Sequence, residues 1–101
     1  MTLEHRKLLT IVTEAALEHE LVRQFERQGA HGYTVTDARG KGDRGIRNAG
    51  WQLSANIRIE VICTADTAHA IAAALRERYY DNYAMVLFIA DVEVLRPEKF
   101  L

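Results

Sequence analysis

The segment from position 40 to position 51 holds the residues best suited to bind a phosphate group. Four of the six glycines of the chain lie there, together with Lys41, Arg44, Arg47 and the only tryptophan, Trp51. Glycine lets backbone N–H groups approach a ligand closely, and the planar guanidinium group of arginine matches phosphate oxygens. The segment shows neither the 3.6-residue period of a helix nor the two-residue period of a strand. These features predict a long ligand-binding loop between two strands.

Two alternatives stay open for this segment from its residues alone. Its glycines and cations also suit a solvated linker, and the glycine spacing matches neither a dinucleotide-binding fingerprint nor a Walker phosphate loop. Trp51 is either an anchor for a protein partner, since interface hot spots favour tryptophan, or a lid that packs on the chain's own sheet.

The composition is that of an ordinary globular domain. The chain has 101 residues, a formal net charge of −1 and a charged fraction of 27%, which predicts a single domain over residues 1–101. A near-neutral charge leaves no electrostatic footprint for nucleic acid or for an anionic membrane. Cys63 is the only cysteine, and no apolar run approaches the roughly 18 residues of a membrane span. We therefore expect a cytoplasmic protein without an intramolecular disulfide or membrane insertion.

The first half of the chain predicts a strand, a helix and a second strand. Residues 8–12 are apolar and β-branched, and Thr13 then offers an N-cap hydroxyl, with Glu14 at the positive end of the helix dipole. The helix carries one apolar stripe, and Gly29 suits the left-handed residue after its end. Residues 32–36 form the second strand. The members of the stripe are Leu17, Leu21, Val22 and Phe25.

The second half repeats this order. Ile57, Ile59 and Val61 alternate with charged residues, which predicts a strand with one buried face. Thr64 or Asp66 can cap a second helix. Residues 85–92 predict a fourth strand that is apolar on both faces, so that each face needs a cover. The apolar stripe of the second helix consists of Ala68, Ile71, Ala72, Leu75 and Tyr79.

Two βαβ units in succession predict a ferredoxin-like βαββαβ sandwich of the α+β class. In this plan two helices cover one face of a four-stranded antiparallel sheet. The other sheet face then lies open, which favours a symmetric oligomer over a monomer.

Several short stretches occur along the chain in an order known from one family. The chain resembles the PII-like signalling proteins, and among them the SbtB type, the regulators associated with bicarbonate transporters. The resemblance extends from about residue 7 to residue 95. It is carried by Val12-Thr13-Glu14, Gly32-Tyr33-Thr34-Val35, Gly40-Lys41-Gly42-Asp43-Arg44 with Arg47 following, Ala55-Asn56-Ile57-Arg58-Ile59-Glu60, Tyr83-Ala84 and Glu93-Val94-Leu95.

This resemblance implies a homotrimer that binds an adenine nucleotide in the clefts between subunits. It also implies a T-loop over residues 39–54 that docks on a membrane transporter or an enzyme. By resemblance, Arg44 and Arg47 hold the phosphate, Lys41 and Gly42 begin the T-loop, and Arg47 and Trp51 contact the protein partner. The residues implied to border adenine and ribose are Gly32, Tyr33, Thr34 and Val35 on the second strand, with Phe88 and Ile89 on the fourth.

The chain departs from the nitrogen-sensing PII proteins at the turn after the second helix. Those proteins have a glycine-rich turn with a lysine that holds the triphosphate of ATP, whereas residues 80–83 here read Tyr-Asp-Asn-Tyr. The resemblance therefore favours AMP, ADP or cyclic AMP over ATP as an effector, with no prosthetic group and no enzymatic activity. Bicarbonate as a further ligand is left open, and so is a contribution of Arg96 and Lys99 to the site.

Three other functions compete with regulation. A small phosphate hydrolase of the acylphosphatase-like fold could use Arg44 and Asn56, but no pair of nucleophile and base is evident. A metal-binding trimer resembling the CutA proteins would share the fold, yet the four histidines and Cys63 show no ligand spacing. RNA binding on the sheet lacks the paired aromatic residues and basic surface of an RNA-recognition motif.

Overall fold

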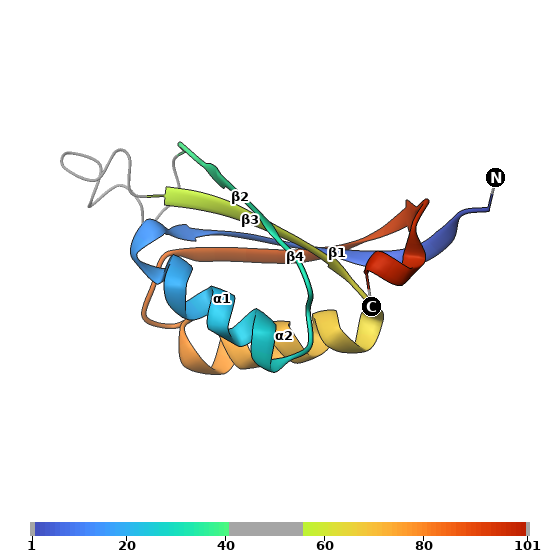
Figure 1. Ribbon diagram of the computed structural model, residues 1–101. Helices are drawn as coiled ribbons and strands as arrows, with labels where there is room; N and C mark the ends of the chain where they lie inside the picture. The colour runs from blue at the N-terminus through green and yellow to red at the C-terminus, as the bar shows by residue number, and fades with distance from the viewer. Residues whose placement is uncertain (1, 41–55, 101) are drawn as a thin grey trace.

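The computed structural model describes residues 2–40 and 56–100. Its strands form one antiparallel sheet in the order β2-β3-β1-β4, and both helices lie on the same side of this sheet (Figure 1). The predicted ferredoxin-like βαββαβ fold is therefore confirmed. In chain order the elements are β1 (Glu4–Glu14), the 3-10 helix η1 (Ala15–Leu17), α1 (Glu18–Arg27), β2 (Thr34–Asp37), β3 (Asn56–Cys63), α2 (Ala65–Arg78), β4 (Met85–Val94) and the 3-10 helix η3 (Pro97–Lys99).

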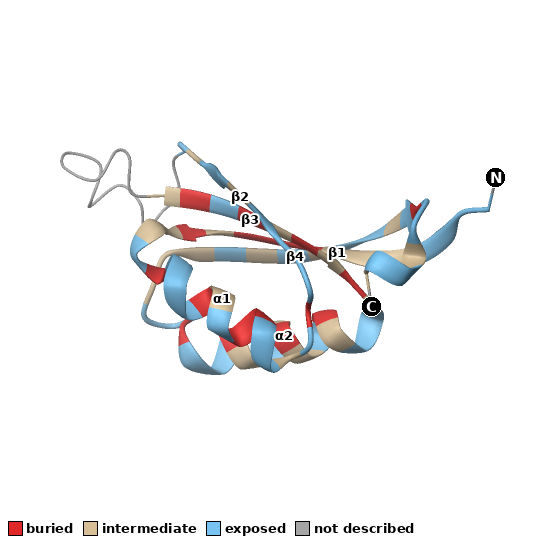
Figure 2. Cartoon of the chain, in the orientation of Figure 1, coloured by how far each residue is buried: buried red, intermediate tan, exposed pale blue. Residues whose placement is uncertain are grey.

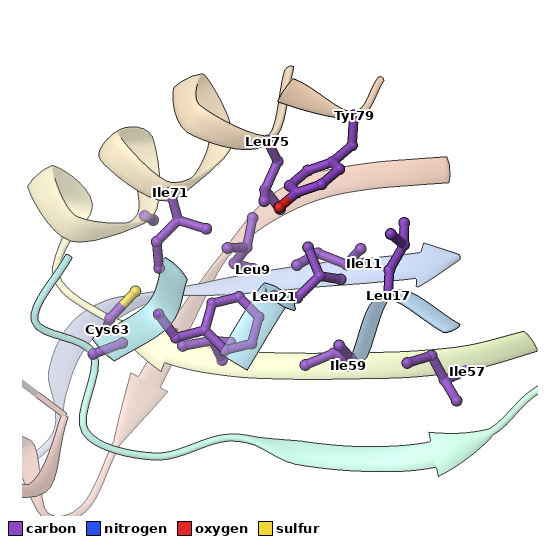
Figure 3. Close-up of a cluster of buried hydrophobic side chains, with 14 residues drawn as sticks. Leu9, Ile11, Leu17, Leu21, Ile57, Ile59, Cys63, Ile71, Leu75 and Tyr79 are labelled. Carbon is purple, nitrogen blue, oxygen red and sulfur yellow. The ribbon is translucent and has the colours of Figure 1, made fainter. Parts of the chain in front are cut away.

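The hydrophobic core fills the space between the sheet and the two helices (Figures 2 and 3). Alternate residues of the two central strands point into it, and Leu9, Ile11, Ile59 and Val61 are fully buried. Burial of each such side chain favours folding by about 1.5–3 kcal/mol. Most members of the two predicted helix stripes meet these strands as buried residues: Leu17, Leu21, Phe25, Ala68, Ile71, Leu75 and Tyr79.

Two local predictions of helix ends are confirmed. The Thr64 hydroxyl oxygen accepts a hydrogen bond from the Thr67 N–H at 3.3 Å, so Thr64 is the N-cap of α2. Gly29 follows the end of α1 with a φ of 87°, a left-handed conformation that side chains with a Cβ adopt only at a cost.

The N-cap prediction for Thr13 is wrong. Strand β1 continues through Thr13 and Glu14, and the chain passes through η1 before α1 begins at Glu18. The N-cap position of α1 is Leu17, which makes no capping hydrogen bond with its side chain. The Thr13 hydroxyl instead donates to the carbonyl of Ala84 at 2.8 Å. A contact with a residue 71 positions away thus replaces the expected local one.

The second strand begins later than predicted. Gly32 and Tyr33 precede β2, whose pairing with β3 starts at Thr34, the partner of Glu60. The Tyr33 ring lies against the Phe25 ring of α1, with 5.9 Å between centroids. This aromatic contact ties the approach to β2 to the helix layer.

The two faces of β4 differ, although both are apolar. Met85, Leu87 and Ile89 pack against the core, whereas Val86 and Phe88 point away from the helices and are 56% and 45% exposed. The cover that the sequence predicts for this second face is not supplied by the described part of the single chain.

Polar contacts also join segments that are far apart in the sequence. The Arg6 guanidinium group donates to the carbonyl oxygens of Phe100 at 2.9 Å and Pro97 at 3.1 Å, which holds the C-terminal turn against β1. The buried Gln24 side chain can accept from Arg27 at 3.2 Å and from Arg78 at 3.1 Å, which links α1 to α2.

No helix within the described ranges is long and apolar enough to cross a membrane.

We expect Gly29→Ala to lower the free energy of unfolding by about 1 kcal/mol, because alanine disfavours a positive φ. No atom lies within 4 Å of the Cβ that this substitution adds, so the cost comes from the backbone alone. Gly32→Ala is the matched control, since its added Cβ also meets open space and its φ is not in the left-handed region. Urea denaturation measures both variants, and equal losses would contradict this explanation.

Candidate functional site

The predicted phosphate-binding segment leaves and rejoins the sheet at one end. The Ala38 N–H donates to the Asn56 carbonyl oxygen at 3.0 Å, and Asp37 pairs with Ile57. The described residues that flank the segment, at the end of β2 and the start of β3, are therefore neighbours. The residues predicted to contact phosphate or a partner in this segment, Lys41, Gly42, Arg44, Arg47 and Trp51, lie outside the described residues.

The residues predicted to border adenine and ribose lie on opposite edges of the sheet. Thr34 and Val35 belong to β2 and follow Gly32 and Tyr33 directly, whereas Phe88 and Ile89 belong to β4. Strands β3 and β1 lie between them, so three inter-strand spacings, roughly 14 Å, separate the two groups. The two groups are therefore not neighbours within one chain.

The direction of each side chain divides these residues further. Val35 and Ile89 face the helices and pack, half-buried, against the core. Thr34 and Phe88 point to the other side, which we call the outer face of the sheet. Both lie in one row across the sheet, because Thr34 pairs with Glu60, Glu60 with Thr10 and Thr10 with Phe88.

The outer face combines apolar and charged groups. Its apolar residues include the exposed Val86 and Phe88. Its charged residues include Arg58, whose guanidinium group lies 3.4 Å from the Glu60 carboxylate. Thr10 is fully buried beneath this layer, and its hydroxyl has no hydrogen-bond partner within the described part of the chain. Such a surface has the apolar content of an interface and carries charges that can pair across it.

A polar contact that the sequence did not predict lies at the same end of the sheet as Ala38 and Asn56. The Ala84 N–H donates to the Glu14 carboxylate at 3.0 Å, while the Ala84 carbonyl accepts from the Thr13 hydroxyl. Glu14 is itself the strand partner of Asn56. Thr13 and Glu14 at the end of β1 thus bind the backbone of Ala84, which connects the α2–β4 turn to β4.

A shallow hollow of about 270 Å³ lies between α2 and the free edge of β4, lined by Ala72, Arg76, Tyr80 and Leu87. Its polar groups are one guanidinium and one phenol. Within residues 2–40 and 56–100, no three His, Cys, Asp or Glu side chains gather closely enough to hold a metal ion. Burial of the Cys63 thiol raises its pKa above the usual range, which makes it a poor nucleophile or ligand at neutral pH.

The amino-acid sequence matches the model of one protein family. The model of the nitrogen regulatory protein P-II matches residues 6–99. The chain belongs to the P-II family. The predicted family resemblance is confirmed, and the family is one of regulatory proteins.

Solved structures agree with this P-II assignment. A PII-like signalling protein from Thermus thermophilus is 44% identical, covers 100% of both chains and has a TM-score of 0.85. CPII from Thiomonas intermedia, bound to ADP and bicarbonate, is 26% identical over 99% of this chain and 98% of its own, with a TM-score of 0.87. Bacillus subtilis GlnK with ATP is 14% identical over 87% of this chain and 82% of its own, and its TM-score of 0.66 shows the shared fold. These relatives support the P-II family, and the SbtB subtype stays a prediction.

We expect Thr10→Val to raise the free energy of unfolding by about 1 kcal/mol if the hydroxyl stays unpaired, because valine has the same shape without a buried polar atom. Thr34→Val is the control in the same row, where an exposed hydroxyl should change stability by less than about 0.5 kcal/mol. Thermal and urea unfolding measure both. A loss of stability in Thr10→Val would contradict this expectation and show that the hydroxyl has a partner in the assembled protein.

Proposed function

We propose that this P-II family protein is a regulator that binds an adenine nucleotide between the subunits of a homotrimer. One observation carries the proposal: the implied nucleotide residues lie on opposite edges of the sheet, so that contact between two copies of the chain would bring them together. The relatedness to CPII supports the ligand class, since structures of CPII hold ADP and bicarbonate, and in another case ADP, AMP and bicarbonate.

In this proposal the phosphate is held by Arg44 and Arg47, with Lys41 and Gly42 at the start of the T-loop. The β2 edge of one subunit, from Gly32 to Val35, and the β4 edge of its neighbour, with Phe88 and Ile89, border the adenine and ribose. Phe88 offers a ring face for the base, whereas Ile89 offers backbone because its side chain packs on the core.

The proposed effector is AMP, ADP or cyclic AMP rather than ATP. Residues 80–83 form the turn between α2 and β4 and contain neither glycine nor lysine to surround a triphosphate. Bicarbonate is a second proposed ligand, on the strength of its presence in the CPII structures.

The outer face supplies the proposed trimer contact. Val86 and Phe88 would lose their exposure to water there, and Arg58 and Glu60 would pair across subunits. The nucleotide clefts then form at the borders of the same contact, so that ligand binding and assembly depend on each other.

We propose that the T-loop carries the signal to a cytoplasmic surface of a membrane transporter, for bicarbonate or another anion, as expected of the SbtB type. Arg47 and Trp51 are the proposed contacts of this partner. Nucleotide binding would favour one arrangement of the loop. Coupling of this kind is reciprocal, so the transporter must change nucleotide affinity by the same factor.

Calorimetric titration with AMP, ADP, ATP and cyclic AMP, each with and without bicarbonate, tests the proposed ligand site. We expect micromolar binding of at least one of AMP, ADP and cyclic AMP, and weaker binding of ATP. Arg44→Ala and Arg47→Ala should each weaken it by about 10- to 100-fold, because each removes a charged hydrogen bond worth about 1.5–3 kcal/mol. Arg23→Ala, which removes an exposed cation from α1, is the charge-matched control and should bind as the wild type does. Absence of binding to all four nucleotides would refute the proposal.

Light scattering on a Phe88→Glu variant tests the proposed assembly. A charge on the outer face in every subunit should dissociate the trimer, because an unpaired charge buried in an interface costs several kcal/mol. Tyr80→Glu is the control, since Tyr80 is 40% exposed, close to the exposure of Phe88, but lies near the end of α2. A Phe88→Glu variant with the same mass in solution as the wild type would exclude the outer face as the contact.

A further inference from the structure

Two guanidinium groups meet at one buried side chain between the helices. Gln24 of α1 is only 3% exposed, and its amide oxygen can accept from Nη1 of Arg27 at 3.2 Å and from Nη1 of Arg78 at 3.1 Å. Arg27 is the last residue of α1, and Arg78 is the last residue of α2. The two Nη1 atoms therefore lie within two hydrogen-bond lengths of each other.

The charge of these two arginines is not neutralised by the described part of the chain. Neither guanidinium group forms an ion pair with a carboxylate of residues 2–40 or 56–100. Glu26 and Glu77 directly precede the two arginines in the sequence, but adjacent positions on a helix do not face each other. Gln24 accepts hydrogen bonds without cancelling charge, because its amide is neutral. Two like charges at this separation repel, and a bound anion would remove the repulsion.

The helix dipoles explain only part of this arrangement. The negative end of a helix dipole stabilises a cation in the last turn, and Arg27 and Arg78 both occupy such positions. Arg76 also lies in the last turn of α2 but is not a partner of Gln24. The dipole thus accounts for an arginine near a helix end, whereas the convergence of two arginines on one buried amide needs a further reason.

The two guanidinium groups are accessible and have donors left for a ligand. Arg27 and Arg78 are exposed, and the helices lie on the side of the sheet opposite to the outer face (Figure 1). Each guanidinium group has five N–H donors in a planar fork, and the contact with Gln24 uses one nitrogen atom of each. Because Gln24 is buried and fixes both groups, a ligand would lose less side-chain entropy on binding them.

We infer that Arg27 and Arg78 form an anion site for a tetrahedral dianion, either free phosphate or the phosphate group of a small ester. Two guanidinium charges match a dianion, whereas a single carboxylate would leave one of them uncompensated. Each fork can bind two phosphate oxygens. Gln24 is the positioning residue that holds the two forks together. The site shares no residue with the proposed nucleotide site, so the inference does not rest on the proposed function.

NMR titration of the full-length protein tests this site. The variant Arg44→Ala with Arg47→Ala is the background, so that the proposed nucleotide site does not contribute to phosphate binding. Inorganic phosphate and glycerol 3-phosphate are titrated at constant ionic strength, and a hexaglutamate peptide represents an acidic protein partner. The resonances of the Gln24 side-chain amide and of the arginine Nε–H groups report binding at the site.

Two charge-matched variants in this background separate the site from general electrostatics. Arg27→Gln with Arg78→Gln removes both charges and keeps an N–H donor at each position. Arg23→Gln with Arg76→Gln is the control, since it removes the same charge from exposed positions of the same two helices that are not partners of Gln24. If the first variant does not fold, Arg27→Gln and Arg78→Gln are measured singly against the same criterion.

We expect saturable phosphate binding with a dissociation constant of about 1 mM, weakened at least about tenfold by Arg27→Gln with Arg78→Gln and unchanged in the control. Equal binding of glycerol 3-phosphate would assign the site to phosphate esters as well, whereas its failure to bind would restrict the site to the free ion.

Three results would overturn the inference. These are the lack of a saturable shift up to about 50 mM phosphate, equal weakening in the two double variants, and binding of hexaglutamate without binding of phosphate. A wild-type protein that binds no nucleotide would instead refute the proposed function and leave the result at Gln24 standing.

Discussion

The hydrogen-bonded pairing of β1 along both of its edges is the constraint on which the other features depend. Eight residue pairs align it with β3 and ten with β4, so its alignment places every side chain of the two flanking strands. Alternate residues of β1 are buried beneath the helices, and a shift against either neighbour would disrupt the core or the polar contacts at the strand ends. The positions of Phe88, Glu60 and Arg58 on the outer face follow from this one strand.

This topology is the reason why the proposed function depends on assembly. Strands β3 and β1 separate the two edge strands of the sheet, β2 and β4. The residues that the family resemblance implies for ligand binding are divided between these two edges. The open outer face and the division of these residues both follow from the order of the four strands, with the helices on one side only. In the proposed trimer, a chain of this design would join its ligand residues by contact with another copy, and the cleft between subunits would hold the regulatory ligand.

The structure also shows how polar residues complete what apolar patterning leaves open. Burial selects the inner face of β3 without ambiguity, because Ile57, Ile59 and Val61 alternate with more polar neighbours. The alternation is weaker in β4, where residues 85–90 are apolar on both faces and only the last four residues alternate polar with apolar side chains. Directional hydrogen bonds from Thr13 and Glu14 to the backbone of Ala84 then join the end of β1 to the start of β4.

Features that depend on near neighbours in the chain can be predicted from the amino-acid sequence alone. The apolar stripes of the helices, the alternation of β3, the Thr64 cap and the left-handed Gly29 all follow from periods and local hydrogen bonds, and the order of short stretches identified the P-II family. Tertiary structure alone decided that Thr13 and Glu14 hold Ala84, about 70 residues away, rather than cap a helix. It also decided that Gln24 is buried and that Gly32 to Val35 and Phe88 lie at opposite edges. A single sequence records residue types and spacing, whereas these contacts depend on how distant strands meet in space.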